Sequence, residues 1–240
     1  MRRRFNPPPG LRRRAGGQAA TEFIIIFPML VFLVFGVIQW GLIYQARATL
    51  NHAALLAARA GAVHNGKKAD MEKALAAGLT PLFASDPTMA GYAAARAKAF
   101  TEISVAKLAK IDIVNPTTQA MSDFGQTRLD GTAGKEVPND TLSYRNPAPG
   151  ASSGVSIQDA NILHIRVSYC YRLIVPVVGR MIHAAANASF LSKTLDANGM
   201  SDPFSIDPPL IDDCTRPLVS GPRIRIQSEA IVRMQSPFYF

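Results

Sequence analysis

The sequence of 240 residues has few of the side chains from which metal and catalytic sites are built. None of its four histidines has a metal-ligating neighbour at a useful spacing. Three acids, Asp196, Asp202 and Asp207, fail the spacing of an EF-hand, which favours a turn over a calcium site. Ser104 and Lys107 form a Ser-x-x-Lys pair, but the other motifs of penicillin-binding enzymes are missing. We therefore predict no catalytic residue, no bound metal and no cofactor.

Acidic side chains are also missing before Gly17, where the chain carries six arginines: Arg2, Arg3, Arg4, Arg12, Arg13 and Arg14. Without these six the formal charge of +9 falls to +3. The rest of the chain has no basic stripe of the kind that a nucleic-acid-binding protein presents, so we predict no nucleic-acid partner. Arginines beside an apolar segment instead indicate topology, because they keep that end of the segment in the cytoplasm.

No charged residue occurs from Phe23 to Ala46, a run long enough to cross a bilayer as a helix. A buried core helix of this length is rarely apolar on all sides. A secretory signal is the competing interpretation, because Ala46-Arg47-Ala48 resembles a small-x-small cleavage site. The apolar region of such a signal is only about 7–15 residues long, however. We therefore predict a transmembrane helix, with the part of the chain that follows it exported from the cytoplasm.

The pattern divides the chain into three parts: a basic cytoplasmic leader over 1–17, a helix over 18–62 and an exported domain over 63–240. Pro28 lies inside the helix, where a membrane span tolerates it. The second part of the helix is alanine-rich and has one packing face, formed by Leu50, Ala54, Ala57 and Gly61. Asn65 and Gly66 are expected to end the helix.

The exported domain is predicted to be α+β, with helices packed on a small antiparallel sheet. Strict alternation predicts strands over 163–173 and 224–234, and a short strand is expected over 111–114. A helix is expected over 70–78, ended by Gly78 and Pro81. Further helices are expected over 177–188 and from an N-cap at Asp86 towards Lys110. The segments 115–159 and 196–217 are predicted to be long loops, the first with a hairpin as an option.

Cys170 and Cys214 are the only cysteines, and the predicted topology places both in an oxidising compartment. Cys170 falls on the polar face of its strand, while Tyr169 and Tyr171 fall on the buried face. Cys214 lies in the loop before the last strand, which could fold back over that polar face. We predict a disulfide between them, with two unrelated thiols as the alternative.

The start of the helix, Gly17-Gln18-Ala19-Ala20-Thr21-Glu22-Phe23, resembles the processing site of type IV pilin-like proteins. It is followed by Phe35-Gly36, by Tyr44-Gln45-Ala46-Arg47 and by an alanine-rich stretch that reaches Gly61. Together these features resemble the TadE-like pseudopilins of the tight-adherence (Tad/Flp) pilus, over about 17–61.

The resemblance implies a non-enzymatic minor pseudopilin or assembly factor of a type IVb pilus, with a pilin-like exported domain. A prepilin peptidase would cut between Gly17 and Gln18, and Glu22 with Phe23 would then direct assembly. Close packing between membrane helices would use Pro28 and three small residues, Gly36, Gly41 and Ala46. The expected partners are the peptidase, other pilins or pseudopilins, the assembly platform and the lipid bilayer. The expected location is the bacterial inner membrane, in a single pass with the N-terminus cytoplasmic and the C-terminal domain periplasmic or extracellular, and incorporation into a pilus is an option.

Two other interpretations stay open on the sequence alone. The chain could be an uncleaved, single-pass anchored periplasmic binding or enzymatic domain, in which Glu22 is only an acid at a helix start in the headgroup region. It could also be a secreted soluble protein cleaved after Ala48.

Overall fold

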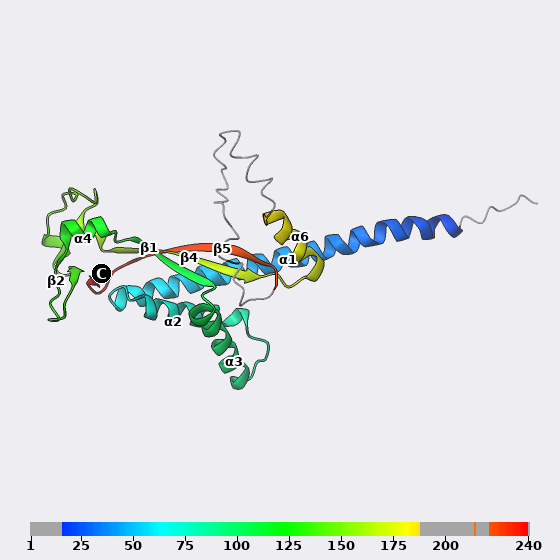
Figure 1. Ribbon diagram of the computed structural model, residues 1–240, viewed down its shortest axis with the longest axis horizontal. Coiled ribbons are helices and arrows are strands. Elements are labelled where there is room, and N and C mark those ends of the chain that lie inside the picture. Colours follow the sequence, from blue (N-terminus) through cyan, green and yellow to red (C-terminus); the bar gives the residue numbers. More distant parts are fainter. Residues whose placement is uncertain (1–15, 188–213, 215–220, 240) are drawn as a thin grey trace, which may run out of the picture.

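The computed structural model describes residues 16–187, 214 and 221–239 of the chain. Its longest element is helix α1, Gly16–Val63, which at 1.5 Å per residue is about 70 Å long. The N-terminal part of α1 projects from the body of the protein, and its C-terminal part runs along that body (Figure 1). The long helix predicted from the sequence is therefore confirmed, and it continues through Pro28.

Helix α1 ends in a left-handed turn at the two expected residues. Asn65 and Gly66 have φ angles of 59° and 74°, and the Gly66 amide donates to the Gly61 carbonyl at 2.8 Å. This bond satisfies one of the carbonyls that a helix end leaves without a partner. The chain then enters helix α2, Lys68–Leu79.

Helix α2 runs antiparallel to α1 and packs closely against its alanine-rich part. The predicted packing face is confirmed, because Leu50, Ala54 and Ala57 are completely buried. Gly78 and Pro81 were predicted to end α2, which ends between them at Leu79, so Gly78 itself lies inside the helix. A Cβ atom at Gly78 would lie 2.5 Å from the Cα of Ala53. The glycine at position 78 is therefore required by the close approach of the two helix backbones and not by the end of α2.

The main sheet is antiparallel, with the strand order β1-β4-β5. Its strands are β1, Ala109–Asn115, β4, Ile162–Arg172, and β5, Arg223–Arg233. The odd-numbered residues Leu163, Ile165 and Val167 are completely buried, and α1 contacts both β4 and β5. The predicted alternation is confirmed in the first half of β4 and in most of β5. In the second half of β4 it is lost, because Ser168 and Cys170, which were expected on the polar face, are also buried. With helices on one face of a small antiparallel sheet, the fold is α+β, as predicted.

A partly buried polar cluster, which the sequence did not predict, holds one end of this sheet. Tyr169 Oη donates to Glu102 Oε2 at 2.7 Å, and Arg223 Nη1 donates to the Cys170 carbonyl at 2.8 Å. Arg223 is only 4% exposed, and its Nη2 lies 3.5 Å from Glu102 Oε1. Burial, with the nearby Glu102 carboxylate, raises the pKa of Tyr169, so the phenol keeps its proton and remains the donor.

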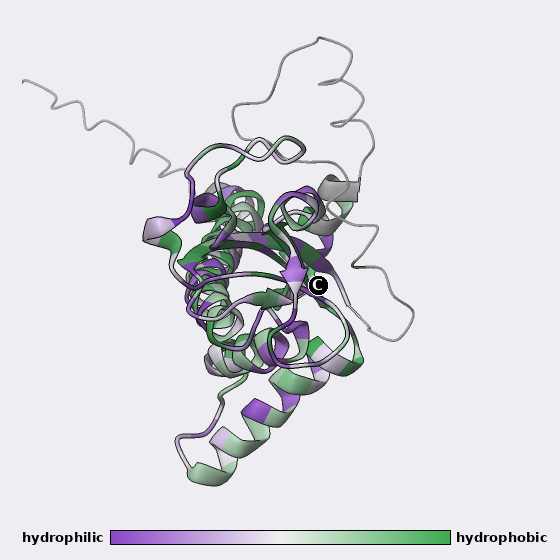
Figure 2. Ribbon diagram, turned by 90° about the vertical axis from the view of Figure 1, so that its left-hand side faces the viewer, coloured by the Kyte–Doolittle hydropathy of each residue, from purple (hydrophilic) through white to green (hydrophobic). Residues whose placement is uncertain are grey.

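Helix α3, Met89–Phe100, begins later than predicted. Its N-cap is Thr88, whose Oγ1 accepts from the Gly91 amide at 3.1 Å. The predicted cap, Asp86, instead accepts a hydrogen bond from the Thr88 amide at 3.1 Å. A π-helical turn, η2, Thr101–Val105, follows, so the helix ends well before the predicted limit. Helix α3 projects from the body in both views (Figures 1 and 2).

The segment 115–159 is more structured than the predicted loop. It contains α4, Thr118–Phe124, β2, Gln126–Thr127, β3, Lys135–Val137, and the short helices η3, Leu142–Tyr144, and α5, Ile157–Ala160. The optional hairpin is present as β2 and β3, and β3 also pairs with β6, Phe238–Tyr239, in a second antiparallel sheet. Strands of two or three residues are too short to show periodicity, which is why the sequence did not reveal them.

Cys170 and Cys214 form a disulfide with a Cα–Cα distance of 5.5 Å. Between them in the chain lies helix α6, Pro176–Asn187. The rest of the loop predicted over 196–217, with Asp196, Asp202 and Asp207, lies outside the described residues.

The packing at Gly78 gives a direct test of the α1–α2 interface. We expect Gly78→Ala to lower the free energy of unfolding by about 1–3 kcal/mol, because the added methyl group must push α2 away from the Ala53 backbone. The matched control is Gly41→Ala in α1, where a Cβ meets nothing within 4 Å. Thermal unfolding followed by circular dichroism in detergent measures both variants. If Gly78→Ala stabilises the protein as much as the control does, the proposed close packing is wrong.

Candidate functional site: the N-terminal helix

The projecting part of α1 is an apolar surface that the body does not cover. Large side chains along it are widely exposed, among them Phe23, Ile24, Met29, Leu33 and Val37, each above 60%. Among the described residues, α1 is the one helix long and apolar enough to cross a membrane, with its most apolar window entirely unburied. In water this surface would carry a large hydration cost, so it needs a lipid or protein environment.

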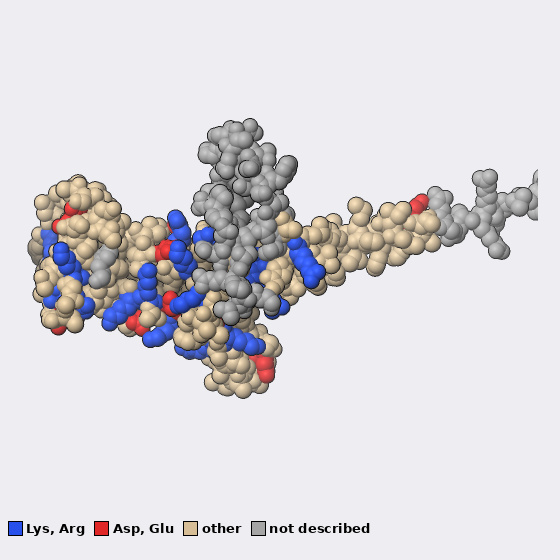
Figure 3. Space-filling view, viewed as in Figure 1, with Lys and Arg blue, Asp and Glu red and all other residues tan. Residues whose placement is uncertain are grey.

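Glu22 lies at the start of this surface, in the second turn of α1, and is exposed. The projecting part of α1 carries one acidic spot near its tip (Figure 3), and Glu22 is the only acid in that stretch of the sequence. The next residue, Phe23, stacks on Phe27 with ring centroids 5.0 Å apart. Gly17 and Gln18, the predicted processing site, belong to the first helical turn. The structure thus places the predicted processing and assembly residues within two adjacent turns.

The small residues predicted to pack membrane helices fall in two different environments. A Cβ atom at Gly36 or Gly41 would meet nothing within 4 Å, so both backbones are open to approach by another helix. Ala46, in contrast, is completely buried in the core of the body. The role expected of Ala46 between membrane helices is therefore corrected: its small side chain serves packing within this chain.

One polar residue of the apolar run is used inside the protein. Gln39 is completely buried, and its Oε1 accepts a hydrogen bond from the Val175 amide at 2.9 Å. Val175 lies in the turn between β4 and α6, and α6 contacts α1. Sequence reasoning missed this anchor, although an amide within an otherwise apolar run was the available signal.

The body carries a cleft of about 690 Å³ near the C-terminal end of α1, lined by residues that include Lys67, Asp112, Thr118 and Tyr239. Within the described part of the chain, no group of three or more His, Cys, Asp or Glu side chains could hold a metal ion. The carboxylate of Glu229 binds Arg166 and His164, at 2.7 and 2.9 Å. The hydrogen bond from Arg166 has the largest part in lowering the pKa of Glu229, and the hydrogen bond with His164 lowers it further. This arrangement is an ion-pair network on an open sheet face, and it lies outside the cleft.

These features define the chain as an α+β protein with one apolar helix that extends beyond its folded body. Residues 17–59 match the model of a family described as TadE-like protein, and this confirms the resemblance predicted from the sequence. The match lies wholly within α1. The TadE-like family consists of components associated with the Tad pilus and is not a family of enzymes. None of the curated proteins or solved structures compared with the chain matches it.

The Gln39 anchor can be tested with a variant of similar size. We expect Gln39→Met to lower the free energy of unfolding by about 1–3 kcal/mol, because the buried Val175 amide then loses its acceptor. Gln45→Met is the matched control, since Gln45 lies on the same helix and is exposed. Thermal unfolding gives the stability, and limited proteolysis reports opening near the β4–α6 turn. Equal behaviour of the two variants would contradict the assignment.

Proposed function

We propose that this protein is a minor pseudopilin or assembly factor of a type IVb (Tad/Flp) pilus. It is inserted in the bacterial inner membrane by α1, with its N-terminus in the cytoplasm and its body on the periplasmic or extracellular side. The observation that carries the proposal is the division of one continuous helix into an exposed apolar part and a part buried in the body. The TadE-like segment, 17–59, includes both parts.

A prepilin peptidase cuts the chain between Gly17 and Gln18 in this proposal. Both residues lie in the first turn of α1, which must open before the peptide bond can enter a protease. Gly16 and Gly17 favour this opening, because glycine in a helix costs about 1 kcal/mol relative to alanine and terminal turns fray easily. Cleavage removes the six leader arginines and leaves Gln18 with a new ammonium group.

Glu22 then becomes the fifth residue of the mature chain. It lies four residues after Gln18, about 6 Å along the helix axis, within reach of an ammonium group on Gln18 of its own or a neighbouring subunit. An ion pair of this kind in apolar surroundings is short and strong, and it fixes the register between helices more than it adds stability. Phe23 and the open backbones at Gly36 and Gly41 supply contacts for a neighbouring helix.

The processing step is tested on the full chain in membranes, with and without a prepilin peptidase. We expect the intact mass and the N-terminal residue to show peptidase-dependent loss of residues 1–17. Gly17→Leu should reduce cleavage by about a hundredfold, because a large side chain displaces the peptide bond from its position for attack. Gly10→Leu, in the same leader, should leave cleavage unchanged. An N-terminus that stays intact with active peptidase would contradict the proposal and favour an anchored periplasmic domain.

The role of Glu22 is tested separately from processing. Glu22→Gln keeps the shape of the side chain and removes its charge, whereas Glu22→Asp keeps the charge. We expect the glutamine variant to be cleaved normally but to lose co-purification with other pilins of the same system, while the aspartate variant retains part of it. Quantitative crosslinking in membranes measures the association. If both variants associate as the unsubstituted chain does, Glu22 is not an assembly determinant.

A further inference from the structure

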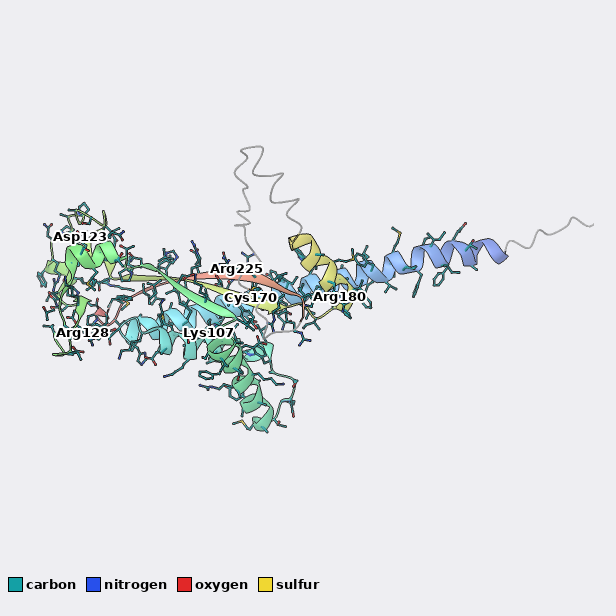
Figure 4. All side chains as sticks on the ribbon, viewed as in Figure 1. Lys107, Asp123, Arg128, Cys170, Arg180 and Arg225 are labelled. Atoms are coloured by element: carbon teal, nitrogen blue, oxygen red, sulfur yellow. A yellow bond between two sulfur atoms is a disulfide. The ribbon has the colours of Figure 1, made fainter. Side chains whose placement is uncertain are left out.

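Helix α6 is fixed at the base of the projecting helix. The turn before it is held by the Val175 amide on Gln39 and by the Leu173 amide, which donates to the Pro222 carbonyl at 2.9 Å. Val178 is 4% exposed and faces the body. Figure 1 shows α6 beside α1, and Figure 4 shows Arg180 where the two helices meet. The position of α6 relative to α1 is therefore set by internal contacts.

The outward face of this region is apolar. Ile174, Val177 and Met181 are 62%, 60% and 53% exposed. Val177 and Met181 are four residues apart in α6 and lie on one side of it, and Ile174 lies in the turn before the helix. A helix that faces water carries polar residues on its outer side. Next to Gln39 on α1, Ile38 and Trp40 are also exposed, so the apolar surface of α1 continues at the point where α6 is attached.

The depth of the attachment point can be estimated from helix geometry. Gln39 follows Phe23 by sixteen residues, or about 24 Å along the axis. If the hydrocarbon core, which is about 30 Å thick, begins at Phe23, then Gln39 lies about 6 Å inside its opposite edge. Interfacial helices bury their apolar faces by about 5–10 Å. Arg47 lies about 12 Å beyond Gln39, at the level of the headgroups.

We propose that α6 and the turn before it form a second contact with the bilayer that α1 crosses. Ile174, Val177 and Met181 enter the outer edge of the hydrocarbon core on the side away from Glu22. Arg180, exposed on the same helix, extends to the lipid phosphates. The contacts of α1 and of α6 with the bilayer are joined through Gln39. Together they fix the tilt of the body relative to the membrane, whereas α1 alone would leave that tilt free. The inference rests on the proposed membrane insertion of α1 and goes beyond it.

The test uses fluorescence quenching in reconstituted vesicles. The full chain has a single tryptophan, Trp40, so Trp40→Phe combined with Val177→Trp leaves one indole on α6. Vesicles of phosphatidylethanolamine and phosphatidylglycerol contain lipids brominated at shallow or deep positions of the acyl chain. We expect shallow bromines to quench the indole of Val177→Trp more strongly than deep ones do. Trp40→Phe combined with Tyr144→Trp is the control, since Tyr144 is 90% exposed and lies in the segment 115–159.

The outcomes separate this inference from the proposed function. Quenching of the indole at position 177, but not at position 144, supports the second contact. No quenching at 177 while the native Trp40 is quenched overturns it and leaves the insertion of α1 intact. A blue shift at 177 that grows with the protein-to-lipid ratio, without quenching, assigns the face to a second copy and also overturns it. Loss of quenching at both 177 and Trp40 overturns the insertion of α1 itself.

Discussion

The continuity of α1 is the constraint on which the rest of the structure depends. One continuous helix, interrupted only by the hydrogen bond that Pro28 cannot donate, passes from an exposed apolar segment to the core of a folded body. Only a helix satisfies its own backbone groups in lipid, and its stiffness joins the two parts mechanically. Any partner that binds the projecting part thereby positions the body as well.

The two parts of α1 use small residues in different ways. In the body, Ala53 allows the backbone of α2 to approach until Gly78 is in contact, and the sheet packs on the neighbouring alanines. In the projecting part, Gly36 and Gly41 leave the backbone open. Polar contacts then fix the relative positions of elements that apolar packing alone does not determine. Gln39 holds the turn before α6, and Arg223 with Glu102 holds the end of the sheet. Apolar contacts have no direction, whereas hydrogen bonds between buried groups do.

Much of the fold followed from periodicity. The long apolar run, the alternation in β5 and in the first half of β4, and the turn at Asn65 and Gly66 are local patterns that the structure has. The misses share a different cause. The N-cap of α3 is Thr88 and not Asp86, because both residues, two apart in the chain, have side chains that can cap a helix, and the choice depends on the backbone geometry of the folded chain. The segment 115–159 gained its order from pairing with β6, which is about a hundred residues away in the chain.

For the candidate site, the sequence by itself determined which residues form the apolar helix, where the carboxylate of Glu22 lies along it, and the TadE-like character of the segment. These properties depend on order along the chain, and a helix converts that order directly into position on its surface. Only the tertiary structure decided that Ala46 belongs to the core, that Gln39 is an internal anchor and that α6 lies beside the projecting helix. Each of these depends on contacts between segments distant in the sequence, where the free energy of packing the whole body decides the outcome and no local pattern records it.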